Sequence, residues 1–223
     1  MATTKSGTPA GSLRERKRDR TRRALVDAAV GLFERDGYDR TTVADIAAAA
    51  DIGTRTFFSY FASKEELLFP ESDARVAAAV AAIAHRKPAD RPADVLVRAL
   101  RDVGAGDGEP DDMVDRVAAL RTRLFATVPA VRGRALQIQL DAQREIAGHL
   151  RRAFPDELDQ VTAAALVGAF VGAVSGALQA LLDDPGNPNA TDDPDQLRRQ
   201  LRRATDVALR PWRLQPPAGA EAS

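Results

Sequence analysis

Residues 42–61, with the sequence TVADIAAAADIGTRTFFSYF, decide the fold of this chain. Thr42 precedes an apolar stripe and has Asp45 three residues later, so a hydroxyl and a carboxylate can satisfy each other's free amides and begin a helix. Apolar residues at 3.6-residue spacing predict that this helix runs over residues 43–50; they are Val43, Ile46, Ala47 and Ala50. Residues 51–53 interrupt the stripe before it resumes. The pattern therefore predicts two short helices joined by a tight turn.

The second helix carries side chains that suit contact with DNA. When two short helices cross around a shared core, the start of the second one can enter a major groove. Hydroxyls and a guanidinium can reach base edges and phosphates there; they belong to Thr54, Arg55, Thr56 and Ser59. The alternative is that the two threonines only cap the helix and that Arg55 is a solvated surface charge, because short motifs give false matches.

Positive charge is concentrated upstream of this motif. Residues 5–23 contain eight Lys and Arg side chains against two acidic ones, a net charge of +6, although the whole chain has a formal net charge of +0. Neutralised phosphates release counterions, so this basic arm predicts salt-dependent binding to nucleic acid. Residues 1–12 are rich in Thr, Ser, Gly and Pro, and we expect them to be a disordered, solubilising tail.

The composition argues against several classes of protein. The 223 residues include no cysteine and two histidines, so no disulfide is possible and no metal site is expected. The N-terminus has no positively charged and then apolar secretory signal, which favours the cytoplasm. We find no nucleophile elbow, phosphate-binding loop followed by Lys, or zincin motif, so neither an enzyme nor a bound cofactor is predicted.

Three runs between Leu25 and Leu68 resemble the TetR family of transcriptional regulators: ALVDAAVGLF, DGYDRTTVADIAAAADI and TFFSYFASKEELL. In the last run, Ser63 and Glu66 have the spacing of a second capping box. The turn departs from the family pattern, with Asp51 where glycine is usual and Gly53 where a capping serine is usual. Asp tolerates a left-handed backbone, so we expect the turn to form with one cap or phosphate contact fewer.

The resemblance implies a set of DNA contacts: Thr42, Thr54, Arg55, Thr56, Ser59, Tyr60 and Lys64. Tyr60 and Lys64 would hold phosphates, whereas Arg55 would choose a base, typically guanine. Alternatively, Tyr60 is a half-buried core ring with its hydroxyl in water. Replacing Arg55 by alanine is expected to remove selectivity, and replacing Lys64 is expected to weaken binding to every sequence.

The chain is thus predicted to be all-α, with two domains and two loose tails. Residues 13–69 would form a three-helix, helix-turn-helix DNA-binding domain, and residues 70–212 a helical ligand-binding and dimerisation domain. Residues 1–12 and 213–223 would be the tails. Pro70 marks either a hinge between the domains or a simple helix boundary.

Two long patterns in the C-terminal half predict helices with a buried stripe. A first stripe ends at Pro129; its members are Met113, Val117, Leu120 and Leu124. The helix expected over residues 131–154 would turn its own stripe inward; its members are Leu136, Leu140, Ala147, Leu150 and Phe154. Gln143 lies on this second stripe and needs a polar partner, either another side chain or the head group of a ligand.

Residues 119–150 also resemble, more loosely, the TetR subgroup whose sensor domain is described as binding acyl-CoA-like ligands. This second resemblance implies an apolar or acyl-CoA-like effector. The pocket lining that it suggests consists of Arg121, Phe125, Gln137, Gln143 and Phe170.

Residues 163–182 contain no charge and could span a bilayer by length. Their Ala and Gly content and their acidic flanks argue against a membrane segment. Gly168, Gly172 and Gly176 recur every fourth residue and predict a smooth ridge for close helix packing, which the resemblance places in a dimer interface. Burial within one subunit is the alternative.

Taken together, the sequence predicts a homodimeric repressor that binds a palindromic operator and is released by an apolar or acyl-CoA-like small molecule. A regulator that activates, or that acts without a ligand, would keep every N-terminal argument. A helical lipid carrier would make the basic arm incidental and would show no sequence-selective binding to DNA.

Overall fold

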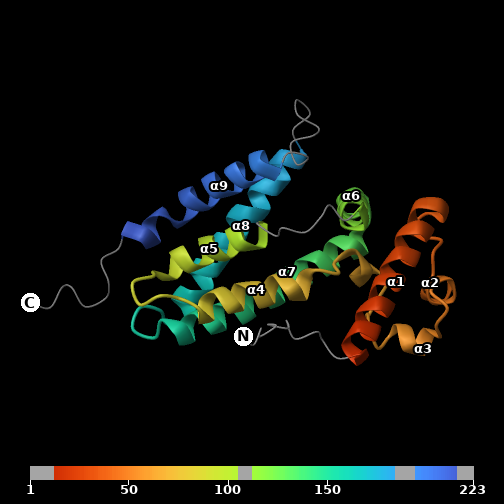
Figure 1. Ribbon diagram of the computed structural model, residues 1–223. Coiled ribbons are helices and arrows are strands. Elements are labelled where there is room, and N and C mark those ends of the chain that lie inside the picture. Colours follow the sequence, from red (N-terminus) through yellow and green to blue (C-terminus); the bar gives the residue numbers. More distant parts are fainter. Residues whose placement is uncertain (1–12, 105–111, 184–193, 215–223) are drawn as a thin grey trace, which may run out of the picture. The chain divides into compact units, whose positions relative to one another are not determined.

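The computed structural model describes residues 13–104, 112–183 and 194–214, and every regular element in these ranges is a helix (Figure 1). The predicted all-α fold class is confirmed. The α-helices are α1 (Leu13–Asp36), α2 (Val43–Ala49), α3 (Thr54–Phe57), α4 (Ser72–Ala84), α5 (Pro92–Gly104), α6 (Asp112–Thr127), α7 (Pro129–Ala153), α8 (Gln160–Leu182) and α9 (Pro194–Leu214). A 3-10 helix, η1, spans Glu65–Leu68. The tail predicted at residues 1–12 lies outside the described residues, as do residues 215–223 of the tail predicted at 213–223. Residues 213 and 214 are instead the last two residues of α9.

The first compact unit contains α1 to η1, α6 and the start of α7. Its core is one apolar cluster to which each of these helices contributes side chains. Leu25 and Val30 of α1, Ile46 of α2 and Phe57 of α3 are almost completely buried in it. Burial of so many large apolar side chains holds three short helices that would not be stable in isolation.

The position of α6 differs from the predicted domain organisation, which placed every residue after Pro70 in a C-terminal domain. The predicted stripe is buried, but Val117, Leu120 and Leu124 pack into the cluster built by α1. Residues 112–135 thus belong with the helix-turn-helix region because their apolar face completes its core. The division between the two units along the chain falls after Pro70, after Gly108 and after Ala135.

The second unit contains α4, α5, α8, α9 and the remainder of α7 around a second apolar cluster. Leu96, Leu150, Leu166 and Leu209 are fully buried in it, and Trp212 packs against it near the end of α9. The end of α9 is also fixed by ion pairs, because Arg213 contacts both Asp94 and Asp206.

The stripe predicted along α7 is only partly buried. Leu150 and Phe154 are buried, whereas Leu136 and Leu140 are each 50% exposed. The helix leaves the first unit at Ala135, and the second cluster includes α7 residues only from Ile146 onward. Helical periodicity was correct along α7, but Leu136 and Leu140 lie in the intervening turns and stay half-exposed.

Candidate nucleic-acid interface

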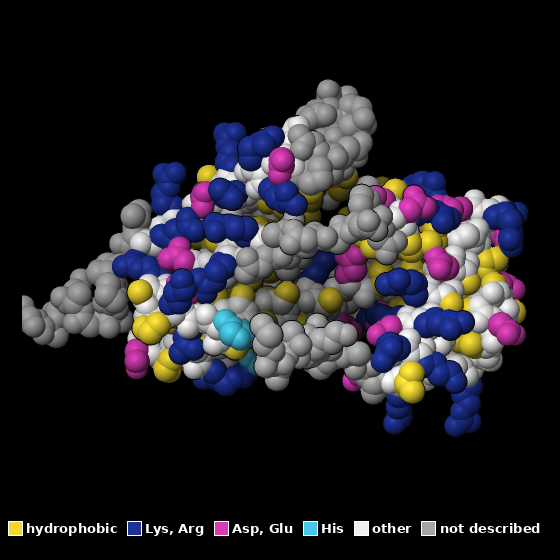
Figure 2. All heavy atoms as spheres, viewed as in Figure 1, with side chains coloured by type: hydrophobic (Ala, Val, Ile, Leu, Met, Phe, Trp, Pro, Cys, Tyr) yellow, Lys and Arg dark blue, Asp and Glu magenta, His cyan; other side chains and the backbone are white. Residues whose placement is uncertain are grey.

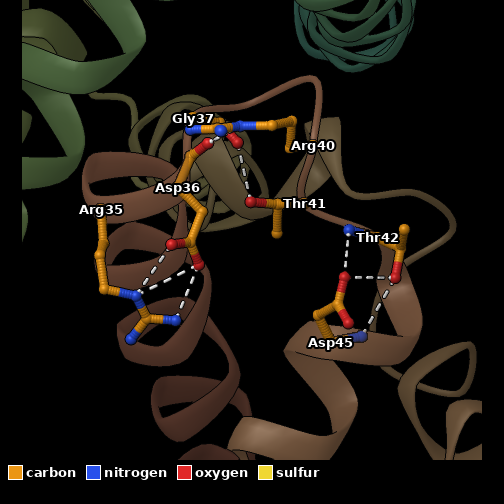
Figure 3. A network of polar contacts seen from close by, with 7 residues as sticks. All are labelled: Arg35, Asp36, Gly37, Arg40, Thr41, Thr42 and Asp45. Carbon is orange, nitrogen blue, oxygen red and sulfur yellow. Dashed lines mark hydrogen bonds and ion pairs between the residues drawn. The ribbon is translucent and has the colours of Figure 1, made fainter.

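The start of α2 is held by the predicted capping box (Figure 3). The hydroxyl oxygen of Thr42 accepts from the amide of Asp45 at 3.2 Å, and the Asp45 carboxylate accepts from the amide of Thr42 at 2.9 Å. Hydrogen bonds from the Thr42 hydroxyl and amide hold the pKa of Asp45 below its usual range. This reciprocal cap fixes the point at which the chain enters the helix-turn-helix.

The turn after α2 has the geometry expected of its sequence. Asp51 has a φ of 55°, in the left-handed region, as predicted from its tolerance of that conformation. Its amide donates to Ala48 at 3.1 Å, and the next amide, of Ile52, donates to Ala47 at 2.9 Å, a Schellman pattern that satisfies the last carbonyls of α2. Gly53 then caps α3 without a side-chain hydrogen bond, as expected from the missing serine.

The left-handed turn leads to a test of stability. Asp51→Val is expected to lower the free energy of unfolding by about 1–2 kcal/mol, because a β-branched residue tolerates this backbone poorly. Asp51→Gly should cause no loss, since glycine adopts a positive φ without steric cost. Thermal unfolding of the two variants beside the parent protein measures both effects. Equal losses in both variants would show that the Asp51 side chain matters more than its backbone conformation.

Helix α3 is short and is anchored by aromatic rings. Its helical hydrogen bonds continue past Phe57, because the amide of Phe58 donates to Thr54 at 3.2 Å and that of Phe61 donates to Phe57 at 3.0 Å. Phe57 and Phe61 are buried, with ring centroids 6.1 Å apart. The predicted DNA-contacting residues Thr54, Arg55, Thr56 and Ser59 are all exposed on this segment.

Two predicted contact residues are less exposed. Tyr60 is half-buried and packs against the first apolar cluster, which agrees with the alternative reading of a core ring. The Lys64 ammonium donates to the carbonyls of Tyr38 at 2.9 Å and Thr41 at 3.0 Å, and it lies 4.1 Å from the centroid of the Tyr38 ring. An ammonium has three N–H donors, so at most one remains for a phosphate.

The second predicted capping box is not formed as expected. The Glu66 carboxylate accepts from the amide of Ala62 at 2.6 Å, one residue before Ser63. The helix predicted from Ser63 is the 3-10 helix η1, whose N-cap is Lys64 and lacks a side-chain hydrogen bond. A 3-10 turn is tighter than the α-helix for which the capping-box spacing holds.

The described part of the basic arm is helical and largely exposed. Residues 13–20, at the start of α1, are all exposed. Figure 2 shows Lys and Arg side chains projecting from the part of the first unit where Figure 1 places the start of α1 and α3. Arg22 has a structural role instead. It donates to the carbonyls of Tyr60 and Pro70, and its guanidinium lies 4.3 Å from the centroid of the Phe61 ring.

The loop before α2 is held to η1 by a hydrogen bond from the Tyr38 hydroxyl to Glu65. Burial, followed by this bond, raises the pKa of Tyr38. Burial alone would raise the pKa of Glu65, but hydrogen bonds from Ser63 and Tyr38 outweigh it and hold that pKa below its usual range. The neutral phenol and the charged carboxylate are therefore the forms that the fold favours.

These shifts predict how stability depends on pH. The contribution of Tyr38 is complete below the ordinary tyrosine pKa of about 10 and is lost as the pH rises through the raised value. That of Glu65 is present above about pH 4.3 and is lost as the pH falls through the lowered value. Tyr38→Phe should cost about 1.5 kcal/mol at neutral pH and flatten the alkaline decline. Thermal unfolding between pH 4 and 11 measures this, with Tyr60→Phe as the matched control; identical profiles for the two variants would contradict it.

The predicted pocket residues fall in both units. Arg121 and Phe125 belong to the first unit, where Arg121 donates to the carbonyl of Leu68 at 3.2 Å and Phe125 lies beneath the guanidinium of Arg132. The others belong to the second unit: Gln137 is exposed, Gln143 is half-buried, and Phe170 packs against the second cluster. Among the described residues, no group of three His, Asp or Glu side chains could hold a metal ion.

The predicted glycine ridge lies on α8. Gly172 and Gly176 are exposed and Gly168 is half-buried, and a Cβ added at any of them would meet no atom within 4 Å. Exposed apolar residues share their face: Val161, Ala164 and Ala165. By length and composition α8 could also cross a membrane, with a mean hydropathy of 2.0 over a window that is 17% buried.

Comparison with known proteins agrees with this geometry. Residues 25–69, which hold α2, the turn and α3, match the model of the family described as bacterial regulatory proteins, tetR family. The helix-turn-helix region of this chain is therefore similar to that of the TetR family. The HTH-type transcriptional regulator TcmR of Streptomyces glaucescens is 36% identical to this chain over 148 residues. That match covers 65% of the chain and 64% of TcmR, so the chain spans a little under two thirds of this relative's length.

A solved structure extends the likeness to most of the fold. Thermus thermophilus FadR, a TetR-family transcriptional repressor in complex with lauroyl-CoA, matches with a TM-score of 0.53. The match covers 91% of this chain and all of FadR, at 20% identity. The family and these relatives are regulators and not enzymes. At this level of identity the likeness concerns the fold alone.

Proposed function

We propose that this chain is a transcriptional regulator that binds a palindromic operator in cytoplasmic DNA as a homodimer. The exposed polar face of α3, with Thr54, Arg55 and Thr56 held above the buried Phe57, carries the proposal. Arg55 would read a base in the major groove, and the exposed basic turns of α1 would supply phosphate contacts. Thr42, Ser59, Tyr60 and Lys64 would complete the contact set at the backbone.

The homodimer would form through the exposed face of α8. Val161 is 76% exposed there, and small residues occupy the turns that follow, so that another backbone could approach closely. A second copy would remove this apolar surface from water and give the twofold symmetry that a palindrome requires. A membrane would also cover an apolar face, but the glycine ridge favours a helix as its partner.

The effector would be an apolar or acyl-CoA-like small molecule bound in the second unit. The looser resemblance of residues 119–150 supports this class, and FadR, which shares the fold, binds lauroyl-CoA. Gln143 of α7 is half-buried and offers a side-chain amide for the polar part of a ligand. Leu136 and Leu140 of the same helix are half-exposed and offer apolar surface for its hydrocarbon part. The ligand would release DNA only if it binds more tightly to the conformation that fits DNA poorly.

Contacts within the first unit could couple ligand binding to DNA binding. Arg134, near the start of α7, forms an ion pair of 3.0 Å with Glu66 of η1, and Arg121 of α6 donates to Leu68 of the same short helix. η1 closely follows the recognition segment. A ligand that displaced α7 would therefore act on the element that supports α3.

Fluorescence anisotropy on the DNA upstream of the protein's own gene tests this function. We expect binding at fixed salt that scrambled DNA does not reproduce and that lauroyl-CoA reverses. Selective binding unaffected by lauroyl-CoA would favour the second candidate, a regulator that activates or acts without this ligand. Failure to prefer any member of a random duplex library would contradict DNA-sequence recognition altogether.

A further inference from the structure

Phe58 is a large apolar side chain on the reading face of the recognition segment. Its relative exposure is 58%, although its neighbour Phe57 is fully buried. It follows Arg55 by three residues and Thr54 by four, and its amide donates to the Thr54 carbonyl. Residues with this spacing share one face of a helix, so the Phe58 ring lies beside the proposed base-reading side chains.

The ring is held in place rather than absorbed into the core. The Phe57 and Phe58 rings meet edge to face, with centroids 5.4 Å apart and an interplanar angle of 83°. The Phe57 side chain is in turn buried as a member of the first apolar cluster. An aromatic ring fixed on one side and open to water on the other presents a preformed apolar contact at low entropic cost.

We infer that Phe58 is a specificity-determining residue that packs against the C5-methyl group of a thymine in each half-site. The inference rests on the proposed binding of DNA through α3. Phenylalanine has no hydrogen-bond donor for a phosphate or a base edge, and the thymine methyl is the apolar group that the major groove displays. Arg55 would thus be paired on the same helical face with a reader of a different base.

Deoxyuridine in place of thymine isolates this contact, because it removes the methyl group and keeps every base-pairing atom. On an operator selected from random duplexes by the full-length protein, each thymine is replaced in turn and the affinity is measured by anisotropy. We expect one position per half-site at which the parent protein loses about fourfold, the value of one buried methyl group. Replacement in both half-sites should cost about fifteenfold.

Variants assign the loss to Phe58. Phe58→Ala should bind the thymine operator more weakly and should no longer distinguish thymine from deoxyuridine at that position, whereas Phe58→Leu should keep part of the discrimination. Val114→Ala removes similarly exposed apolar surface from α6 and should change neither affinity nor discrimination. Circular dichroism melting checks that Phe58→Ala remains folded, as expected for a ring that is mostly exposed.

Two results would overturn the inference and leave the proposed function intact. One is a parent protein that binds its operator selectively but is indifferent to every thymine replacement. The other is a Phe58→Ala variant that weakens on thymine and deoxyuridine operators by the same factor, which would place the ring against the sugar-phosphate backbone. If the parent protein selects no operator at all, both the inference and the proposed function are contradicted.

Discussion

Arg55→Ala is expected to bind its operator hardly better than unrelated DNA. Arg55 is exposed on α3, and a forked guanidinium makes the commonest specific contact to guanine in the major groove. Loss of one bidentate contact corresponds to about 1–3 kcal/mol of discrimination, or between about fivefold and 150-fold, in each half-site. Anisotropy titrations of operator and scrambled duplexes at several salt concentrations measure the ratio of the two affinities.

Arg20→Ala is the matched control for this experiment. Arg20 is exposed on the basic start of α1, so its loss should weaken binding to both duplexes equally and reduce the salt slope by about one for each subunit, or about two for the dimer. If Arg55→Ala behaved in the same way, Arg55 would be a phosphate contact and the base reader would have to be sought elsewhere on α3.

Local sequence patterns predicted most of the local geometry of this interface, with the capping box at Ser63 as the exception. The capping box at Thr42 and the left-handed Asp51 depend on residues at most three positions apart, and both are present in the structure. The roles of Lys64 and Arg22 could not be read in this way. Lys64 bonds to carbonyls 23 and 26 residues earlier, and Arg22 bonds to carbonyls 38 and 48 residues later. Such long-range partners exist only once the fold has formed.

Periodicity also has a limit that the exposed apolar residues illustrate. It predicts which side chains share a face, but not whether anything covers that face. Leu136 and Leu140 follow the correct spacing on α7 and are nevertheless half-exposed. Phe58, between the buried Phe57 and Phe61, reads as one more core aromatic in the sequence, and only its exposure in the structure singles it out.

Gly172→Leu is expected to convert the proposed dimer into a monomer. A Cβ at Gly172 meets no atom within 4 Å in the chain, so the larger side chain should leave the subunit folded. Between two closely packed helices, however, it would hold the backbones apart. A monomer reads one half-site and loses the benefit of linked binding, about 10² to 10⁴ in affinity. Sedimentation measures the dimer, and anisotropy on the full operator measures the DNA affinity.

Ala77→Leu makes a comparable change in size on an exposed helical surface, that of α4, and should alter neither property. A dimeric Gly172→Leu protein would show that the ridge on α8 is not the interface. A monomeric variant that still bound the full operator tightly would instead contradict the claim that dimerisation raises the affinity for the operator. Because the substitution lies in a different unit from α3, monomer formation together with weak operator binding would reflect assembly rather than damage to α3.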